Sequence, residues 1–282
     1  MIRTATLALA ALLMAAQGSA QDRVERTDAS PFSGYKIVLV GDSTMAPHSG
    51  WGSAFCALHV KSSVACVNLA RGGRSTRSYR QEGSWDLALR EAAVEGYKVR
   101  YVLIQFGHND QSSKSERWTE RTREFPDNLR RYVEDVRAIG AKPVLLTPLT
   151  RREFRQGELR NTLDEWSDEV RRVATELEVP MVDLNAISAA QTQKVGAETA
   201  TQFAQVPPTT DERAAAADGT TLKARPAPPH PATDKSGTGP RGHVTRKFDY
   251  THLGAVGAEV VSRWVAVALA PVAPDLRSQL IP

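Results

Sequence analysis

The first segment that could do chemistry is Gly41-Asp42-Ser43-Thr44, which directly follows the apolar run at residues 35–40. Such a run predicts a buried strand, and a serine in the turn after it projects its hydroxyl from the carboxyl edge of a sheet. Backbone N–H groups beyond that turn are free to hold a negatively charged oxygen. The arrangement therefore predicts a nucleophilic serine, whereas Asp42 and Ser43 by themselves could equally cap a helix.

Attack on a carbonyl carbon also requires a base and a group that orients this base. Asp249 lies three positions before His252, so its carboxylate can reach the Nδ1–H of the imidazole across a turn. This contact would leave Nε2 of His252 facing Ser43. We expect Ser43, His252 and Asp249 to serve as nucleophile, base and orienting carboxylate. An isolated Asp-x-x-His pair is commonplace, so the expectation depends on these segments occurring together.

Donors for the developing negative oxygen are expected at three positions. These are the backbone N–H groups of Ser43 and Gly73 and the side-chain amide of Asn109. Glycine permits a close approach of the backbone to the reacting atoms. Asn109 belongs to Gly107-His108-Asn109-Asp110, which follows a second strand-like run at residues 101–106. This segment alone could be only a turn.

Several other classes of site lack support in the sequence. Arg71-Gly72-Gly73-Arg74 could be mistaken for an RNA-binding segment, but it occurs once. The turn at residues 41–44 lacks the lysine that a phosphate-binding loop requires. Cys56 and Cys66 have no nearby histidine pair to complete a tetrahedral metal site. We expect no nucleic-acid partner, no organic cofactor and no metal.

Short apolar runs alternate along the chain with amphipathic stretches. Strands are expected at residues 35–40, 63–68, 101–106, 143–147 and 180–184, and helices near residues 52–59, 84–93, 126–139, 161–177 and 253–269. Pro126 falls in the first turn of its helix, where a missing N–H costs little. The alternation predicts a doubly wound, three-layer α/β/α sandwich with a central parallel sheet. Such sheets bind ligands at the carboxyl ends of their strands.

The expected organisation is a leader, one domain and one insertion. Residues 1–20 have Arg3, an apolar stretch and small residues at the end, as in a secretory signal peptide; the alternative is an uncleaved anchor. We expect residues 21–282 to form a single α/β domain that is secreted or periplasmic, with no later apolar run long enough to cross a membrane. Residues 205–245 are rich in Pro, Ala, Thr and Gly, which predicts a flexible insertion, either a solvated loop or a cap over the site.

Charge and cysteine content give weaker indications. The chain has 36 Lys and Arg against 32 Asp and Glu, a formal net charge of +4. This mild excess suits an anionic polymer such as a galacturonate chain, but charge alone carries little weight. Cys56 and Cys66 are the only cysteines, and in an oxidising compartment they invite a disulfide. The alternative is two buried thiols, one on a helix and one on the next strand.

Four segments resemble the sequence blocks of the SGNH, or GDSL-type, hydrolases: Gly41-Asp42-Ser43-Thr44, Gly73, Gly107-His108-Asn109-Asp110 and Asp249-Tyr250-Thr251-His252. Within that superfamily the chain is most similar to the rhamnogalacturonan acetylesterases. The similar strings include Gly50-Trp51-Gly52, residues 68–79, residues 105–110 and residues 147–154, so the likeness spans most of residues 21–282.

The resemblance implies a flavodoxin-like SGNH fold and removal of acetyl groups from pectic polysaccharide. It implies Ser43, Asp249 and His252 as the triad, Ser43, Gly73 and Asn109 as the oxyanion hole, and neither metal nor organic cofactor. The expected partner is an acetylated, anionic polysaccharide or oligosaccharide, with no membrane partner once the leader is removed. Rival functions are a broader acyl hydrolase acting on acetylxylan, short-chain lipids or thioesters, and an inactive polysaccharide-binding protein.

Four arginines are candidates to contact carboxylates of the polymer: Arg74, Arg77, Arg151 and Arg152. Guanidinium groups match carboxylates in geometry as well as in charge, because two parallel N–H donors meet two oxygens. The alternative for each is a solvated arginine or one that pairs with a neighbouring helix. The sequence does not decide between these roles.

Overall fold

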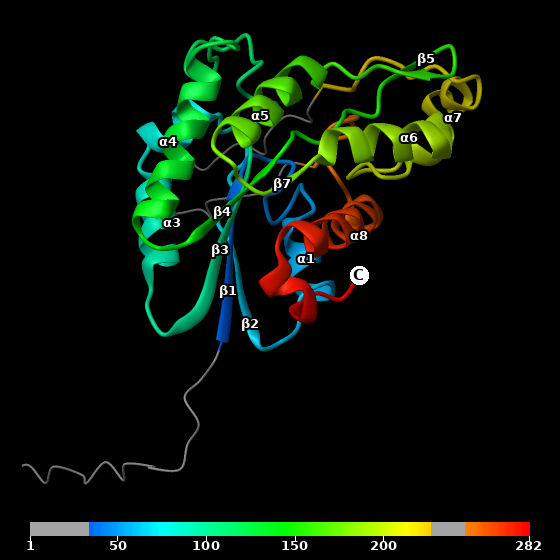
Figure 1. Ribbon diagram of the computed structural model, residues 1–282. Coiled ribbons are helices and arrows are strands. Elements are labelled where there is room, and N and C mark those ends of the chain that lie inside the picture. The colour runs from blue at the N-terminus through cyan, green and yellow to red at the C-terminus, as the bar shows by residue number, and fades with distance from the viewer. Residues whose placement is uncertain (1–33, 227–245) are drawn as a thin grey trace, which may run out of the picture. The chain divides into compact units, whose positions relative to one another are not determined.

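A five-stranded parallel sheet forms the centre of the computed structural model, which describes residues 34–226 and 246–282 (Figure 1). Its strand order is β2-β1-β3-β4-β7, and every neighbouring pair is parallel. The strands are β1 (Gly34–Gly41), β2 (Val64–Asn68), β3 (Tyr97–Gln105), β4 (Lys142–Leu146) and β7 (Met181–Val182). All five predicted strands are confirmed; β3 begins four residues earlier than predicted, and β7 is only two residues long.

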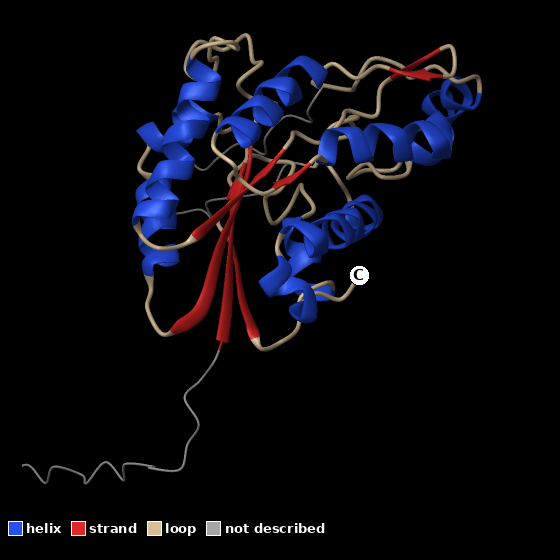
Figure 2. Ribbon diagram, viewed as in Figure 1, coloured by secondary structure: helices blue, strands red, loops and turns tan. Residues whose placement is uncertain are grey.

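Helices cover both faces of this sheet (Figures 1 and 2). One face carries α3 (Ser84–Ala93), α4 (Glu124–Ala138) and α5 (Asp164–Glu176). The other face carries α1 (Gly52–Leu58) and α8 (Ala255–Val272). These five helices were predicted, and together with the sheet they confirm the three-layer α/β/α sandwich.

Strand β1 shows why its sequence is a continuous apolar run. Successive side chains of a strand point to opposite faces of the sheet. Ile37 and Leu39 lie in the core under α1 and α8, while Val38 and Val40 lie in the core under α3, α4 and α5. A strand that is buried on both faces needs apolar residues at every position.

The strand order reverses between β1 and β3, because the chain moves to β2 on one side and continues from β3 to β4 and β7 on the other. Loops that leave two such strands diverge, and the crevice between them is the usual ligand site of open α/β sheets. Ser43 follows β1 and Asn109 follows β3. The topology therefore brings two of the predicted site residues to the same edge.

The sequence analysis missed six elements: α2 (Thr76–Gln81), β5 (Phe154–Arg155), β6 (Glu158–Leu159), α6 (Leu184–Thr201), α7 (Thr210–Ala217) and a 3-10 helix (Pro274–Gln279). Most are short. Helix α6 is long, but its apolar residues form no stripe along one side, and Gly196 interrupts it with a φ of 76°. A sequence pattern based on amphipathic periodicity cannot detect such a helix.

The stretch predicted to be a flexible insertion, residues 205–245, contains a helix in the part that the structure describes. Thr209 and Glu212 form a reciprocal capping box that begins α7. Ala216 on this helix is buried against α6 residues, and the Thr221 N–H donates to the Phe154 carbonyl at 3.0 Å. Capping and burial stabilise a helix that composition alone did not indicate. Residues 227–245 and the predicted leader at residues 1–20 lie outside the described residues.

Helix α8 corrects a second expectation, that no later apolar run is long enough to cross a membrane. It has 18 residues and a mean hydropathy of 1.5, and within the described residues it alone meets that test of length and composition. Val261, Val265 and Leu269 on its inner side are buried in the core with α1 and the sheet. These buried residues dock the helix, which begins three residues after His252.

Cys56 on α1 and Cys66 on β2 form a disulfide, with their Cα atoms 5.5 Å apart. The sequence left open whether these cysteines form a disulfide or remain two buried thiols, and the structure has the disulfide. It joins two consecutive elements on the side of the sheet that α8 also covers.

Replacing both cysteines, as Cys56→Ser with Cys66→Ser, should lower the free energy of unfolding by roughly 3 kcal/mol, because a cross-link between residues 10 positions apart restricts the unfolded chain. Urea unfolding of the double variant and of wild type measures the loss. Wild-type protein that reacts with a thiol reagent after denaturation without reductant would contradict the bond.

Candidate active site

The structure brings Ser43, His252 and Asp249 into one chain of hydrogen bonds. The Oγ of Ser43 lies 2.9 Å from Nε2 of His252, and Nδ1 of His252 lies 2.7 Å from Oδ2 of Asp249. With Nδ1–H donating to the carboxylate, Nε2 is the acceptor for the serine hydroxyl. Ser43 is 8% exposed and the His252 side chain is 23% exposed, so the serine is reached from the surface beside the imidazole.

The Asp249 carboxylate is held in place by its own turn. Its Oδ1 accepts the N–H groups of Thr251 at 2.9 Å and of His252 at 2.7 Å. The Nζ of Lys247 lies 3.3 Å from Oδ2. Burial opposes ionisation of this carboxyl, but the hydrogen bonds and the charge of His252 outweigh burial and hold the pKa of Asp249 well below its usual range. The carboxylate is therefore ionised at neutral pH and can stabilise an imidazolium.

Four buried side chains fix the turn that carries Ser43. The indole N–H of Trp51 donates to Gln105 at 2.7 Å, and the Gln105 amide donates to the Thr44 hydroxyl at 2.6 Å. The backbone N–H and the hydroxyl of Thr44 both donate to Oδ1 of Asp42 at 2.8 Å. Each donor in this series meets an acceptor, and Oδ1 of Asp42 accepts two of these bonds, whereas Oδ2 has no hydrogen-bond partner among the described residues. Sequence reasoning missed the roles of Gln105 and Trp51.

Beneath this turn lies His108, whose Nδ1 is 3.5 Å from Oδ2 of Asp42. Neither ring nitrogen of His108 makes a hydrogen bond within the described residues. Burial lowers the pKa of His108, against the opposing effect of the Asp42 carboxylate. His108 is therefore a buried neutral imidazole, and His252 is the histidine that contacts the serine.

The predicted oxyanion donors at Gly73 and Asn109 belong to segments that contact each other, and the glycine loop passes beside Ser43. The backbone N–H groups of Ser43 and Gly73 make no hydrogen bond to another described residue. A Cβ placed on Gly72 would lie 3.7 Å from the Cβ of Ser43, so this loop passes beside the serine. Asn109 donates one amide hydrogen to the Arg74 carbonyl at 3.1 Å, which leaves its second hydrogen available. Gly73 has a φ of 79°, a conformation that favours glycine.

Asp110 ties the glycine loop to the end of β3. Its carboxylate accepts the Thr76 N–H at 3.0 Å, the Thr76 hydroxyl at 2.5 Å and the Thr119 hydroxyl at 3.1 Å. Thr76 begins α2, directly after the loop that contains Gly73. Asp110 is completely buried, and burial raises its pKa to about 7 although these hydrogen bonds oppose the rise.

Arg117 is a further neighbour of the site that the sequence did not indicate. Its guanidinium lies against Gly73, because a Cβ on that glycine would meet the Arg117 guanidinium atoms at 3.3 Å. Arg117 lies in the loop that follows β3, and no motif marks this loop in the sequence. The contact adds a positive charge beside the predicted oxyanion donors.

The four arginines proposed to contact substrate have different surroundings. Arg74 is ion-paired with Glu82 at 2.8 Å, and Arg77 is ion-paired with Glu124. The prediction for Arg152 is wrong, because this side chain is buried and donates to backbone carbonyls.

Arg151 differs from the other three, because it donates only to the neutral side chains of Gln111 at 2.8 Å and Thr162 at 2.6 Å. No ion pair joins it to an acidic residue within residues 34–226 and 246–282. Burial lowers the pKa of Arg151, and the charges of Glu153, Asp42 and Asp249 oppose this effect. Arg151 is thus a cation held by neutral partners within electrostatic reach of the site.

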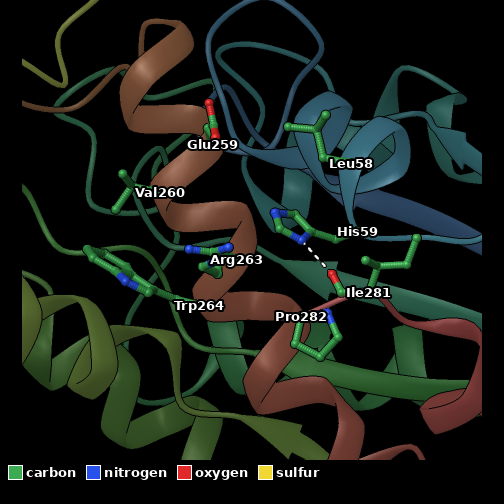
Figure 3. Close-up of a pocket in the computed structure, with 8 residues that line it drawn as sticks. All are labelled: Leu58, His59, Glu259, Val260, Arg263, Trp264, Ile281 and Pro282. Atoms are coloured by element: carbon green, nitrogen blue, oxygen red, sulfur yellow. Dashed lines mark hydrogen bonds between the residues drawn. The ribbon is translucent and has the colours of Figure 1, made fainter.

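Two cavities are lined in part by residues of α8, and neither lining contains the site residues. A cavity of about 230 Å³ lies at the start of α8, and its lining includes His48, Gly50, Arg246 and Gly254. The second cavity, of about 450 Å³, is lined by residues 259, 260, 263 and 264 of α8 together with residues 58 and 59 at the end of α1 and residues 281 and 282 (Figure 3). Its lining contains none of the site residues. Within the described part of the chain, no group of three or more His, Cys, Asp or Glu side chains could hold a metal ion.

Comparison with known proteins agrees with this geometry. Residues 39–231 match the GDSL-like lipase/acylhydrolase family, and the chain belongs to this family. The matched region includes Ser43, Gly73 and Asn109 and ends before Asp249 and His252. The resemblance to the SGNH hydrolases is thereby confirmed.

Two curated relatives come from Bacillus subtilis (strain 168). The chain is 38% identical to the rhamnogalacturonan acetylesterase RhgT over 159 residues, which are 54% of this chain and 65% of the relative, just under two thirds of its length. It is 31% identical to the probable rhamnogalacturonan acetylesterase YesY over 155 residues, 52% of this chain and 69% of the relative. The crystal structure of Bacillus subtilis YxiM superposes with a TM-score of 0.61 at 21% identity, covering 85% of this chain and 57% of that one, which supports the fold.

The buried carboxyl of Asp110 predicts a pH dependence of stability. A carboxyl whose pKa is about 7 in the folded protein and near 3.8 when unfolded favours folding most below pH 4, and this contribution is lost as the pH rises through 7. Asp110→Asn cannot ionise, so wild type should lose free energy of unfolding relative to this variant between pH 4 and pH 8, on the order of 1 to 4 kcal/mol. Urea unfolding of both proteins at several pH values measures the difference, and parallel curves would refute it.

Proposed function

We propose that this protein is an exported serine esterase that removes O-acetyl groups from pectic polysaccharide through an acyl-enzyme on Ser43. The observation that supports the proposal best is the hydrogen-bonded series from Ser43 through His252 to Asp249. A hydroxyl, a neutral imidazole nitrogen and an ionised carboxylate in this order are what nucleophilic acyl transfer requires.

The proposed reaction starts with attack of the Ser43 hydroxyl oxygen on the acetyl carbonyl carbon while His252 Nε2 takes the hydroxyl proton. Asp249 stabilises the resulting imidazolium through Nδ1–H. The negative oxygen of the tetrahedral intermediate accepts hydrogen bonds from the N–H groups of Ser43 and Gly73 and from the Asn109 amide. His252 then protonates the departing sugar oxygen, leaving acetyl-Ser43.

Water completes the cycle by the same steps in the opposite sense. His252 removes a proton from water as the water oxygen attacks the acetyl-Ser43 carbonyl. The second tetrahedral intermediate collapses, acetate leaves, and the proton returns from His252 to the Ser43 oxygen. This series of reaction steps requires only the side chains described above and water.

A pectic substrate is supported by two observations. RhgT is named a rhamnogalacturonan acetylesterase, and YesY is named a probable one. Arg151 offers a cation without an acidic partner among the described residues, and galacturonate units carry carboxylates that such a cation attracts. Arg74 and Arg77 already neutralise Glu82 and Glu124, so Arg151 is the preferred contact.

Export is proposed on the leader-like sequence of residues 1–20 and on the disulfide between Cys56 and Cys66. Disulfides persist in oxidising compartments and are uncommon in the cytosol. A leader followed by a disulfide is consistent with action outside the cytoplasm, where polysaccharides are found.

Ser43→Ala should abolish release of acetate, with a loss of turnover on the order of a millionfold, because the variant lacks the attacking oxygen. Acetate release from acetylated rhamnogalacturonan, acetylated pectin and acetylated xylan measures activity and ranks the substrates. A fluorophosphonate probe should label wild type at residue 43 and leave the variant unlabelled. Retained turnover in the variant, or failure of wild type to react with both esters and probe, would reject the proposal.

Arg151→Gln should raise KM for acetylated rhamnogalacturonan about tenfold, because the loss of one charged contact is worth roughly 1.4 kcal/mol. Hydrolysis of a small neutral acetyl ester should change little. Arg172→Gln is the matched control, since Arg172 is an exposed arginine on α5 that pairs with Glu169. Equal KM values for the charged polymer in wild type and Arg151→Gln would remove Arg151 from the substrate contacts.

A further inference from the structure

Arg152 is a buried cation with an unusual set of partners. Its side chain is 2% exposed, and it makes no ion pair with a carboxylate in the described residues. Nη2 donates to the carbonyls of Asp249 at 3.1 Å and His252 at 2.9 Å, and Nη1 donates to the carbonyl of Thr251 at 3.3 Å. The backbone N–H of Arg152 donates to the Tyr250 carbonyl at 2.8 Å. One residue thus satisfies all four carbonyls of the turn at residues 249–252.

The N–H groups of the same turn have different partners. Those of Thr251 and His252 donate to the Asp249 carboxylate. The next two N–H groups, from Leu253 and Gly254, donate to the carbonyls of Ser49 and Phe203 at 2.9 and 2.8 Å. The Asp249 carboxylate therefore accepts hydrogen bonds from two N–H groups of its own turn. Arg152, which lies outside the turn, donates hydrogen bonds to the carbonyl groups of the turn and anchors it.

Arginine is the side chain suited to this position. A guanidinium presents five donors in one plane and can reach several carbonyls at once, whereas a lysine ammonium is a compact point charge with three donors. Burial lowers the pKa of Arg152 to about 10, with the Asp249 charge opposing the decrease, so the group remains a cation at neutral pH. Burying a cation is costly unless its donors are satisfied. The carbonyls of this turn accept hydrogen bonds from Nη1 and Nη2, whereas Nε has no partner among the described residues.

We propose that Arg152 is a positioning residue, which fixes the imidazole of His252 and the carboxylate of Asp249 at their hydrogen-bonding distances from Ser43 and from each other. The inference rests on the proposed function and assigns to Arg152 a role other than contact with the polymer. Arg152 touches neither the substrate nor the reacting atoms. It acts through the backbone that carries both side chains.

The test compares Arg152→Ala and Arg152→Lys with wild type. Removal of the anchor should lower kcat for a small acetyl ester roughly a hundredfold, because small displacements of reacting groups cost this much. KM should change little, because the substrate contacts remain. Arg152→Lys keeps the charge and loses part of the carbonyl contacts, so its kcat should lie between those of wild type and Arg152→Ala. Guanidinium chloride at millimolar concentration should restore part of the kcat of Arg152→Ala, and sodium chloride at equal concentration should not.

Arg100 provides a matched control far from the site. It also donates to three backbone carbonyls, those of Ala92, Ala93 and Ile139. It lies on β3 five residues before the strand end that faces the site, about 16 Å along the strand. Arg100→Ala should reduce stability and leave kcat near wild type. Equal losses of kcat in Arg100→Ala and Arg152→Ala would mean that Arg152 is only structural and would overturn the proposal.

A readout without substrate separates this inference from the proposed function. The proton on Nδ1 of His252, which donates to Asp249, should give a far-downfield proton resonance in wild type and Arg100→Ala. The resonance should be lost or shifted upfield in Arg152→Ala. If wild type hydrolyses no ester but this pattern holds, the proposed function fails and the positioning role stands. An unchanged resonance in Arg152→Ala overturns the positioning role, whatever the activity.

Discussion

The hydrogen bond between Ser43 Oγ and His252 Nε2 is the contact on which the rest of the site depends, because it joins residues 209 positions apart. Parallel strands put the loops after β1 and β3 at one edge of the sheet, so the serine turn and the Asn109 segment meet there without further devices. The histidine comes from outside the sheet. It reaches this edge because α8, which begins three residues later, is docked by the apolar side chains of Val265 and Leu269 in the core.

Apolar packing sets the layers, but buried polar groups set the positions of the loops. Asp42 fixes the serine turn, Asp110 fixes the start of α2 behind the glycine loop, and Arg152 fixes the turn of Asp249 and His252. An unsatisfied buried charge is costly, so each of these groups permits few arrangements of the backbone around it. These three side chains determine the distances at the site, because they fix the loops that carry the site residues. Each of them positions a residue other than itself.

The sequence predicted the central layers well because they depend on local patterns. Helix α3 was placed at its observed ends. Short motifs at strand ends or before a helix singled out Ser43, Asn109 and His252, and the structure joins Ser43 and His252 by a hydrogen bond. Helix α6 was missed because it lacks an apolar stripe. Arg152 was predicted to contact the polymer, or else to be a solvated or helix-pairing arginine. Charged side chains are rarely buried, and no local pattern shows that four carbonyls converge on this one. The link from Trp51 to Gln105 spans 54 positions and depends on the tertiary fold.

The Ser43 turn and the His252 turn lie far apart along the chain, so the site can form only after both have been synthesised. During translation the ribosome delivers Ser43 before His252 and before the helix that docks it. Nascent fragments that stop before residue 252 contain Ser43 without its hydrogen-bond partner. The Ser43–His252 hydrogen bond therefore forms only after α8 packs onto the sheet.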